Sequence, residues 1–136
     1  PKFFYPIDVR YGDIDAQGHV NNAKFLTYFE HGRTHYMRHL GLYPEGLTFM
    51  EIGVILADVQ ITFLKPVHWE DRVQVGVKTT RLGNKSMTVL QTIEDRESGE
   101  EFARGKVVMV AYDYHQKKTV PIPEAWRGII SAYEGD

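Results

Sequence analysis

One helical pattern in a chain otherwise patterned for strands is the feature that most constrains this fold. Over residues 23–40, large apolar side chains and one glycine recur at steps of three and four and form a single stripe: Phe25, Phe29, Gly32, Tyr36 and Leu40. Gly41, followed by Pro44, predicts where this helix ends. A glycine inside a helix costs about 1 kcal/mol relative to alanine, so Gly32 predicts a close approach to a sheet or to a partner helix.

The rest of the chain has mainly the two-residue period of β-strands. Alternate positions over residues 3–11 are apolar, and Pro6 within them predicts a strand at the edge of a sheet. After the helix, a loop around residues 44–48 leads to a strand whose alternate residues are predicted to share one face: Ile55, Ala57, Val59, Ile61 and Phe63.

Three further strands, two turns and a short second helix follow in the pattern. The strands are residues 72–79, the stretch with Met87, Val89 and Ile93, and residues 102–112; the turns are residues 82–84 and 98–99, and the helix is residues 123–132. One long helix that follows the first strand and precedes four consecutive strands predicts an antiparallel sheet wrapped on that helix. This is an α+β arrangement.

Bulk properties exclude several classes of function. The chain has 136 residues, which we expect to form one domain over residues 1–136. Its net charge of -2 gives no general attraction to nucleic acid or to an anionic membrane, so we expect neither as a partner. The absence of cysteine excludes thiolate nucleophiles, disulfides and cysteine zinc sites. No apolar run approaches the roughly 20 residues of a membrane span, and the first residues lack a signal-peptide pattern, so a cytoplasmic location is expected.

Residues 11–22, Tyr-Gly-Asp-Ile-Asp-Ala-Gln-Gly-His-Val-Asn-Asn, collect chemically active side chains just before the helix. The first turn of a helix has N–H groups without intrahelical partners and a partial positive charge. Asn21 or Asn22 is the expected N-cap. A carboxylate held beside such donors can act on a polarised carbonyl group, which is the minimum apparatus for acyl transfer. The sequence therefore predicts an active site in this loop.

This motif and the aromatic-rich helix after it resemble the hotdog-fold acyl-CoA thioesterases, specifically the 4-hydroxybenzoyl-CoA thioesterase-like family. The later strands and turns also fit, so the resemblance extends over nearly the whole chain. It implies a hotdog fold, with about five antiparallel strands wrapped around one long central helix. It also implies hydrolysis of acyl-CoA to free acid and CoA without a cofactor. Resembling proteins join two sheets edge to edge, with sites across the seam, so a homodimer or a homotetramer is expected.

The resemblance assigns roles within the loop. It places the catalytic carboxylate at Asp15, which would act as a general base toward water or attack the thioester carbon itself. The alternative role for Asp15 is that of an Asx-turn residue bonding its own backbone. Backbone amides near Asn22 are the expected oxyanion donors, and the Asn22 side chain could also orient water. His19 is expected to shape the loop more than to transfer protons, and Asp13 to fix the turn.

Four residues outside the loop are substrate-binding candidates. Glu30 corresponds to a helix carboxylate that touches the substrate end in the resembling thioesterases, with a surface ion pair to Arg33 as the alternative. Arg81, Lys85 and Ser86 lie at a turn that contacts the nucleotide end of CoA in that family. Two cations and a hydroxyl suit phosphates, although an ordinary charged hairpin is the alternative. The turn is not a P-loop, because the first glycine of that motif is missing and two strands flank it.

Two patterns resemble metal sites, and neither is expected to hold a metal. Residues 13–18 begin like an EF-hand calcium loop, but Lys24 stands where that loop needs a bidentate glutamate. His31, His35 and His39 have four-residue spacing, but no carboxylate forms a zincin motif with them. These histidines are therefore expected to mark a solvated or interface face of the helix.

Two other function classes stay open at this point. A hotdog dehydratase or hydratase would use a histidine–carboxylate pair, such as His19 with Asp15, on an acyl thioester. A non-catalytic module would bind acyl-CoA without turning it over. The acyl group, and the choice between CoA and an acyl-carrier protein, are not specified by the motif.

Overall fold

The computed structural model describes residues 1–42 and 52–135. The elements in chain order are β1 (Phe3–Ile7), a 3-10 turn η1 (Tyr11–Asp13), α1 (Asn22–His39), β2 (Ile52–Phe63), β3 (Val73–Leu82), β4 (Ser86–Asp95), β5 (Glu101–Asp113), β6 (Lys118–Thr119) and α2 (Glu124–Glu134). The predicted loop at residues 44–48 lies outside the described residues. No helix in the described part of the chain is long and apolar enough to cross a membrane.

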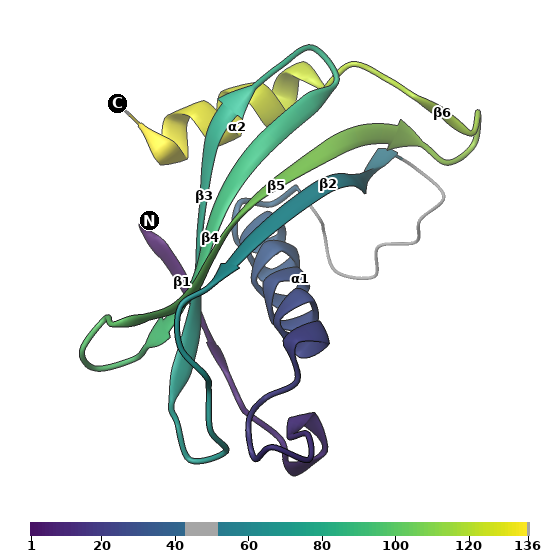
Figure 1. Ribbon diagram of the computed structural model, residues 1–136. Coiled ribbons are helices and arrows are strands. Elements are labelled where there is room, and N and C mark those ends of the chain that lie inside the picture. The colour runs from purple at the N-terminus through teal and green to yellow at the C-terminus, as the bar shows by residue number, and fades with distance from the viewer. Residues whose placement is uncertain (43–51, 136) are drawn as a thin grey trace.

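The strands form one antiparallel sheet in the order β1-β3-β4-β5-β2, with the two-residue β6 paired to β5. The sheet curves around α1, and α2 lies beside the ends of β3 and β4 that are joined by the β3–β4 turn (Figure 1). The α+β arrangement predicted from the period change is confirmed. Pro6 lies in β1 at the edge of the sheet, as its missing N–H predicts. β1 is shorter than the strand predicted over residues 3–11, because its partner β3 begins at Val73, which lies opposite Ile7.

α1 matches the predicted helix to within one residue at each end. Asn21 is the N-cap, and its side chain accepts a hydrogen bond from the Ala23 N–H at 2.9 Å. The helix ends at His39 with Leu40 as its C-cap, and Gly41 just after it has a φ of +79°, which glycine tolerates. A Cβ on Gly32 would lie 2.4 Å from Cγ1 of Val75, so the predicted close approach is confirmed and is made to the sheet.

The core lies between α1 and the inner face of the sheet. The predicted alternation holds in β3, where Val73, Val75 and Val77 are fully buried. It also holds in β4, where Met87 and Ile93 are buried. The predicted turn at residues 82–84, the hairpin at 98–99 and the second helix are all present. η1 and β6 were not predicted, because two or three residues are too short to show a period.

The predicted shared face of β2 is wrong in its first half. The pairing with β5 shifts register between Leu56 and Asp58, so one extra residue interrupts the alternation. Val59 and Phe63 pair with the buried Val107 and Ala103 and share their inner face, but Ile55 does not. A bulge is set by the partner strand, so the period within β2 alone could not reveal it.

Candidate active site

The loop before α1 folds back on itself as a small hairpin around Asp15. Ile14 and Val20 form an isolated antiparallel bridge, and the Asp15 N–H donates to the His19 carbonyl at 2.8 Å. The Gly18 N–H donates a hydrogen bond to the Asp15 carbonyl at 3.0 Å. Gly18 has a φ of +83°, which other residues adopt only with strain, so the turn depends on this glycine.

Asp13 anchors the loop to α1. Its buried carboxylate accepts the Tyr28 hydroxyl at 2.6 Å and the Arg10 N–H at 3.1 Å. Its carbonyl accepts the N–H of the N-cap Asn21 at 2.9 Å. Burial, and then the bond to Asp13, raise the pKa of the Tyr28 hydroxyl, which therefore stays a donor at every physiological pH. Asp13 is fully engaged in fixing the turn, in agreement with its predicted role.

The β2–β3 connection holds the other side of the loop. The Val20 N–H donates to the Val67 carbonyl at 2.8 Å. The His19 ring meets His68 edge to face, with ring centroids 5.1 Å apart. Sequence reasoning missed the part played by Val67 and His68, because contacts between segments far apart in the chain leave no local signal.

Asp15 and the N-terminus of α1 open onto one hollow of about 400 Å³. The hollow is lined by polar loop residues on one side and by Phe25 and the end of β2 on the other: Asp15, Gln17, His19, Val20, Asn21, Asn22, Phe25, Phe63, Leu64, Lys65 and Pro66. The half-buried Asp15 carboxylate accepts the Gln17 N–H through Oδ1, which is the Asx-turn contact. Its second oxygen, Oδ2, accepts no hydrogen bond from the described residues.

The capping of α1 leaves one amide available beside Asp15. The Ala23 N–H donates to the Asn21 side chain, and the Lys24 N–H donates to the Asn21 carbonyl at 2.8 Å. The Asn22 N–H has no acceptor among the described residues, as expected for the first residue of a helix. A carboxylate oxygen and a helix amide at one hollow can together activate a nucleophile and stabilise an oxyanion.

The other predicted binding residues lie away from this hollow. Glu30 is exposed on α1 and does not line it. Arg33, the alternative partner of Glu30, donates to the side chain of the buried Gln91 at 3.2 Å. Arg81, Lys85 and Ser86 surround the β3–β4 turn, at the opposite end of the sheet from the Asp15 loop (Figure 1).

The helix histidines contact aromatic rings of neighbouring elements. His35 stacks on Tyr5 of β1 with ring centroids 3.8 Å apart, and His39 lies against Phe3 and Tyr133. Two of the three histidines thus pack against rings of the same chain, while His31 is exposed. Burial, and then the nearby charges of Arg38 and His31, lower the pKa of His35.

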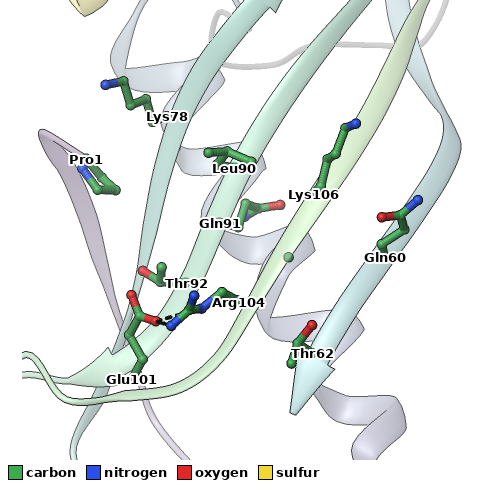
Figure 2. A pocket seen from close by; sticks show the side chains of 11 residues that line it. Pro1, Gln60, Thr62, Lys78, Leu90, Gln91, Thr92, Glu101, Arg104 and Lys106 are labelled. Carbon is green, nitrogen blue, oxygen red and sulfur yellow. Dashed lines mark hydrogen bonds and ion pairs between the residues drawn. The ribbon is translucent and has the colours of Figure 1, made fainter. Parts of the chain in front are cut away.

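A second hollow, of about 470 Å³, lies on the sheet face away from α1 (Figure 2). Lys78, Leu90 and Lys106 are cross-strand neighbours along it. The carboxylate that lines it, Glu101, is paired with Arg104 at 2.8 Å. Sheet N–H groups are used in the strand ladder, so this hollow lacks the combination of carboxylate and open amide found at Asp15.

Known proteins resemble the chain over nearly its whole length. The sequence-family model of the thioesterase-like superfamily matches residues 9–130 of this chain. The chain belongs to this superfamily. The uncharacterized protein YsmA of Bacillus subtilis is 32% identical over 119 residues, which cover 88% of this chain and 78% of that protein. The acyl-CoA thioester hydrolase YbgC of Escherichia coli O157:H7 is 23% identical over 90% of this chain and 91% of its own.

A solved structure supports the same assignment. A thioesterase of Thermus thermophilus, complexed with coenzyme A and Zn, superposes with a TM-score of 0.83 at 34% identity. The match covers 98% of this chain and 95% of that one. The predicted resemblance to thioesterases and the hotdog fold are therefore confirmed.

Proposed function

We propose that this chain hydrolyses acyl-CoA thioesters at the hollow beside Asp15. The observation that carries the proposal is the placement of the Asp15 carboxylate and the Asn22 N–H at one cavity. Asp15 acts on the thioester carbon, directly or through water, and the Asn22 amide stabilises the negative charge that develops on the carbonyl oxygen. The relatives support this reading, because YbgC is named as an acyl-CoA thioester hydrolase and the Thermus thioesterase was crystallised with CoA.

The chemistry can follow either of two routes from the same carboxylate. As a general base, Asp15 removes a proton from water while the oxygen of that water bonds to the thioester carbon. As a nucleophile, Asp15 forms a mixed anhydride that water then cleaves. In both routes the C–S bond breaks and CoA leaves as its thiolate. His19 lines the hollow, where it can contact water or the leaving group.

We further propose that the active unit is a dimer joined along β2. This strand has 12 residues and lies at the sheet edge, and one side of it pairs with no other strand among residues 1–42 and 52–135. Leu56 is 49% exposed and Phe63 is 45% exposed, although both belong to the inner face of the sheet and Phe63 contacts Phe25 of α1. Pairing of β2 with the β2 of a second copy covers the edge, and the facing helices can cover these side chains.

The positions of Asp15 and Lys85 support a site that spans this seam. The ten residues of β3, which run from the Asp15 end of the sheet to the Lys85 turn, extend about 30 Å. The pantetheine arm of CoA has about 13 bonds from its sulfur to the first phosphorus. If each bond extends it as far as a bond of an extended polypeptide does, the arm reaches roughly 15 Å, which is shorter than β3. Antiparallel pairing of two β2 strands reverses one subunit, so the Lys85 turn of one copy comes to the same end as Asp15 of the other.

A thiol-release assay over short, long and aromatic acyl-CoAs tests the function. Release of CoA together with free acid is expected for at least one of them. Hydration of enoyl-CoA without thiol release would instead assign the hydratase class. Acyl-CoA binding with neither reaction would assign a non-catalytic module.

Mixed dimers test the shared site. One subunit carries Asp15→Asn and the other carries Lys85→Ala, with different affinity tags for purification. If the site spans the seam, one of the two sites keeps both native residues, so the mixed dimer shows the wild-type KM and about half of the wild-type kcat. A raised KM would place both residues in one subunit. A monomeric mass by light scattering at micromolar concentration would contradict the dimer, while a tetrameric mass would identify a dimer of dimers.

A further inference from the structure

The β3–β4 turn is tied to α2 through its carbonyl oxygens. Nη2 of Arg127 donates to the carbonyls of Gly83 and Asn84, the latter at 2.9 Å. The Ile122 N–H also donates to the Asn84 carbonyl at 2.9 Å, and a β5 amide donates to the carbonyl of Lys85 at 2.8 Å. Three successive carbonyls of the turn are therefore held by donors from the body of the protein.

This arrangement directs backbone N–H groups to the outside of the turn. In a trans peptide the C=O and N–H point in opposite directions, and the described residues contain no cis peptide. Because Arg127 draws the carbonyls of Gly83 and Asn84 to one side, the N–H groups of Asn84 and Lys85 point to the other. Both residues are exposed, and neither N–H donates a hydrogen bond within the described part of the chain. Successive N–H groups facing one way form a concave site for an anion.

The adjoining side chains add to the same chemistry. Lys85 is exposed, and its ammonium lies 3.4 Å from the Thr119 hydroxyl, a weak contact that a phosphate can replace. Ser86, next in the chain, has a hydroxyl. Backbone amides, an ammonium and a hydroxyl together match the oxygens and the charge of a phosphate group.

We propose that Arg127 is the positioning residue that turns the N–H groups of Asn84 and Lys85 toward a phosphate of the bound coenzyme A. This rests on the proposed function for the identity of the ligand. Arg127 acts through the turn carbonyls and does not touch the phosphate. The C-terminal helix α2 thereby becomes part of the nucleotide-binding apparatus, a role that its own sequence does not show.

Calorimetric titration with CoA and with pantetheine, which lacks phosphate, tests the role of Arg127. In Arg127→Met, CoA affinity should fall about tenfold, because the two amides lose their fixed direction, while pantetheine affinity should stay unchanged. Unchanged CoA affinity would overturn the proposal. An equal loss for both ligands would also overturn it, since it would show a general disturbance of the fold.

Two further variants sharpen the result. Ile130→Val weakens the packing of α2 through a buried side chain but leaves the guanidinium in place, so it should lower the unfolding temperature and keep CoA affinity. Asn84→Pro removes one of the two N–H donors directly and should reproduce the selective loss of CoA affinity. An Asn84→Pro protein that is folded and binds CoA as wild type does would contradict the cradle.

The proposed function can fail separately from this inference. Hydrolysis of acetyl-pantetheine by the wild-type protein tests the thioesterase reaction without any phosphate. CoA titration of Arg127→Met tests the cradle without any hydrolysis.

Discussion

Replacing Gly32 by alanine should destabilise the protein even though alanine is the better helix former. The added Cβ would lie 2.4 Å from Cγ1 of Val75, 3.0 Å from its Cβ and 3.3 Å from Cγ2 of Val77. Carbon atoms prefer about 3.5–4.0 Å, so the closest contact is short by about 1 Å. Val75 is fully buried and its β-branched side chain has little freedom at χ1, so a shift of Val75, α1 or β3 is needed to relieve the contact.

The expected magnitude follows from two opposed effects. Overpacking of a core costs about 1–3 kcal/mol, and the helix propensity of alanine returns about 1 kcal/mol. The difference is a net loss of about 0–2 kcal/mol, which corresponds to a fall in unfolding temperature of up to roughly 8 °C for a chain of this size. Thermal unfolding followed by circular dichroism measures it.

Gly128 provides a matched control. It lies inside α2 and is exposed, and a Cβ there would meet nothing within 4 Å. Gly128→Ala should therefore raise stability by about 0.5–1 kcal/mol. The propensity gain is common to both variants, so their difference isolates the contact with the sheet. Equal unfolding temperatures for the two variants would refute the close approach of α1 to β3.

Three further outcomes are expected. Tyr28→Phe should lower the free energy of unfolding in urea by about 1–2 kcal/mol, because the buried Asp13 carboxylate loses its shortest donor; an unchanged value would contradict the anchoring role of Asp13. The pKa of His35 is lowered in the folded protein, so the unfolded chain binds the proton more readily, and His35 contributes stability above pH 6.5 that is lost as pH falls toward its folded pKa. The free energy of unfolding of wild type should therefore exceed that of His35→Gln by more at pH 7.5 than at pH 5.5. A larger excess at pH 5.5 would contradict the direction of the pKa shift. Lys85→Ala and Ser86→Ala should raise the KM for acyl-CoA more than they lower kcat, and an unchanged KM in both would remove the turn from the nucleotide site.

The features that the sequence predicts well are those encoded locally. The α1 stripe, the β3 alternation and the Gly41 stop each depend on residues a few positions apart. The candidate catalytic loop belongs to this class as well, since Asp15, the N-cap Asn21 and Asn22 lie within eight consecutive positions. Its geometry is largely a hairpin closed by Gly18, and glycine is a strong local signal.

The features that the sequence does not reveal depend on a partner segment. The β2 bulge arises from pairing with β5, and the hold of Val67 and His68 on the loop arises where the β2–β3 connection returns beside it. Arg127 looks like an ordinary helix cation until the fold places it under the β3–β4 turn. The separation of Asp15 from Lys85 likewise follows from the direction of β3, which individual motifs do not convey.

Steady-state hydrolysis by Asp15→Asn tests the central claim most directly. Asparagine retains the size of aspartate and can still accept the Gln17 N–H, so a merely structural Asp15 tolerates the change. A catalytic Asp15 does not, because an amide neither removes a proton from water nor attacks carbon at a useful rate. The account predicts a folded protein with little change in KM and a kcat lowered at least ~100-fold, while Asp13→Asn loses stability and much less activity. A folded Asp15→Asn protein that keeps more than about a tenth of the wild-type kcat would contradict the account and direct the search to His19 or Glu30.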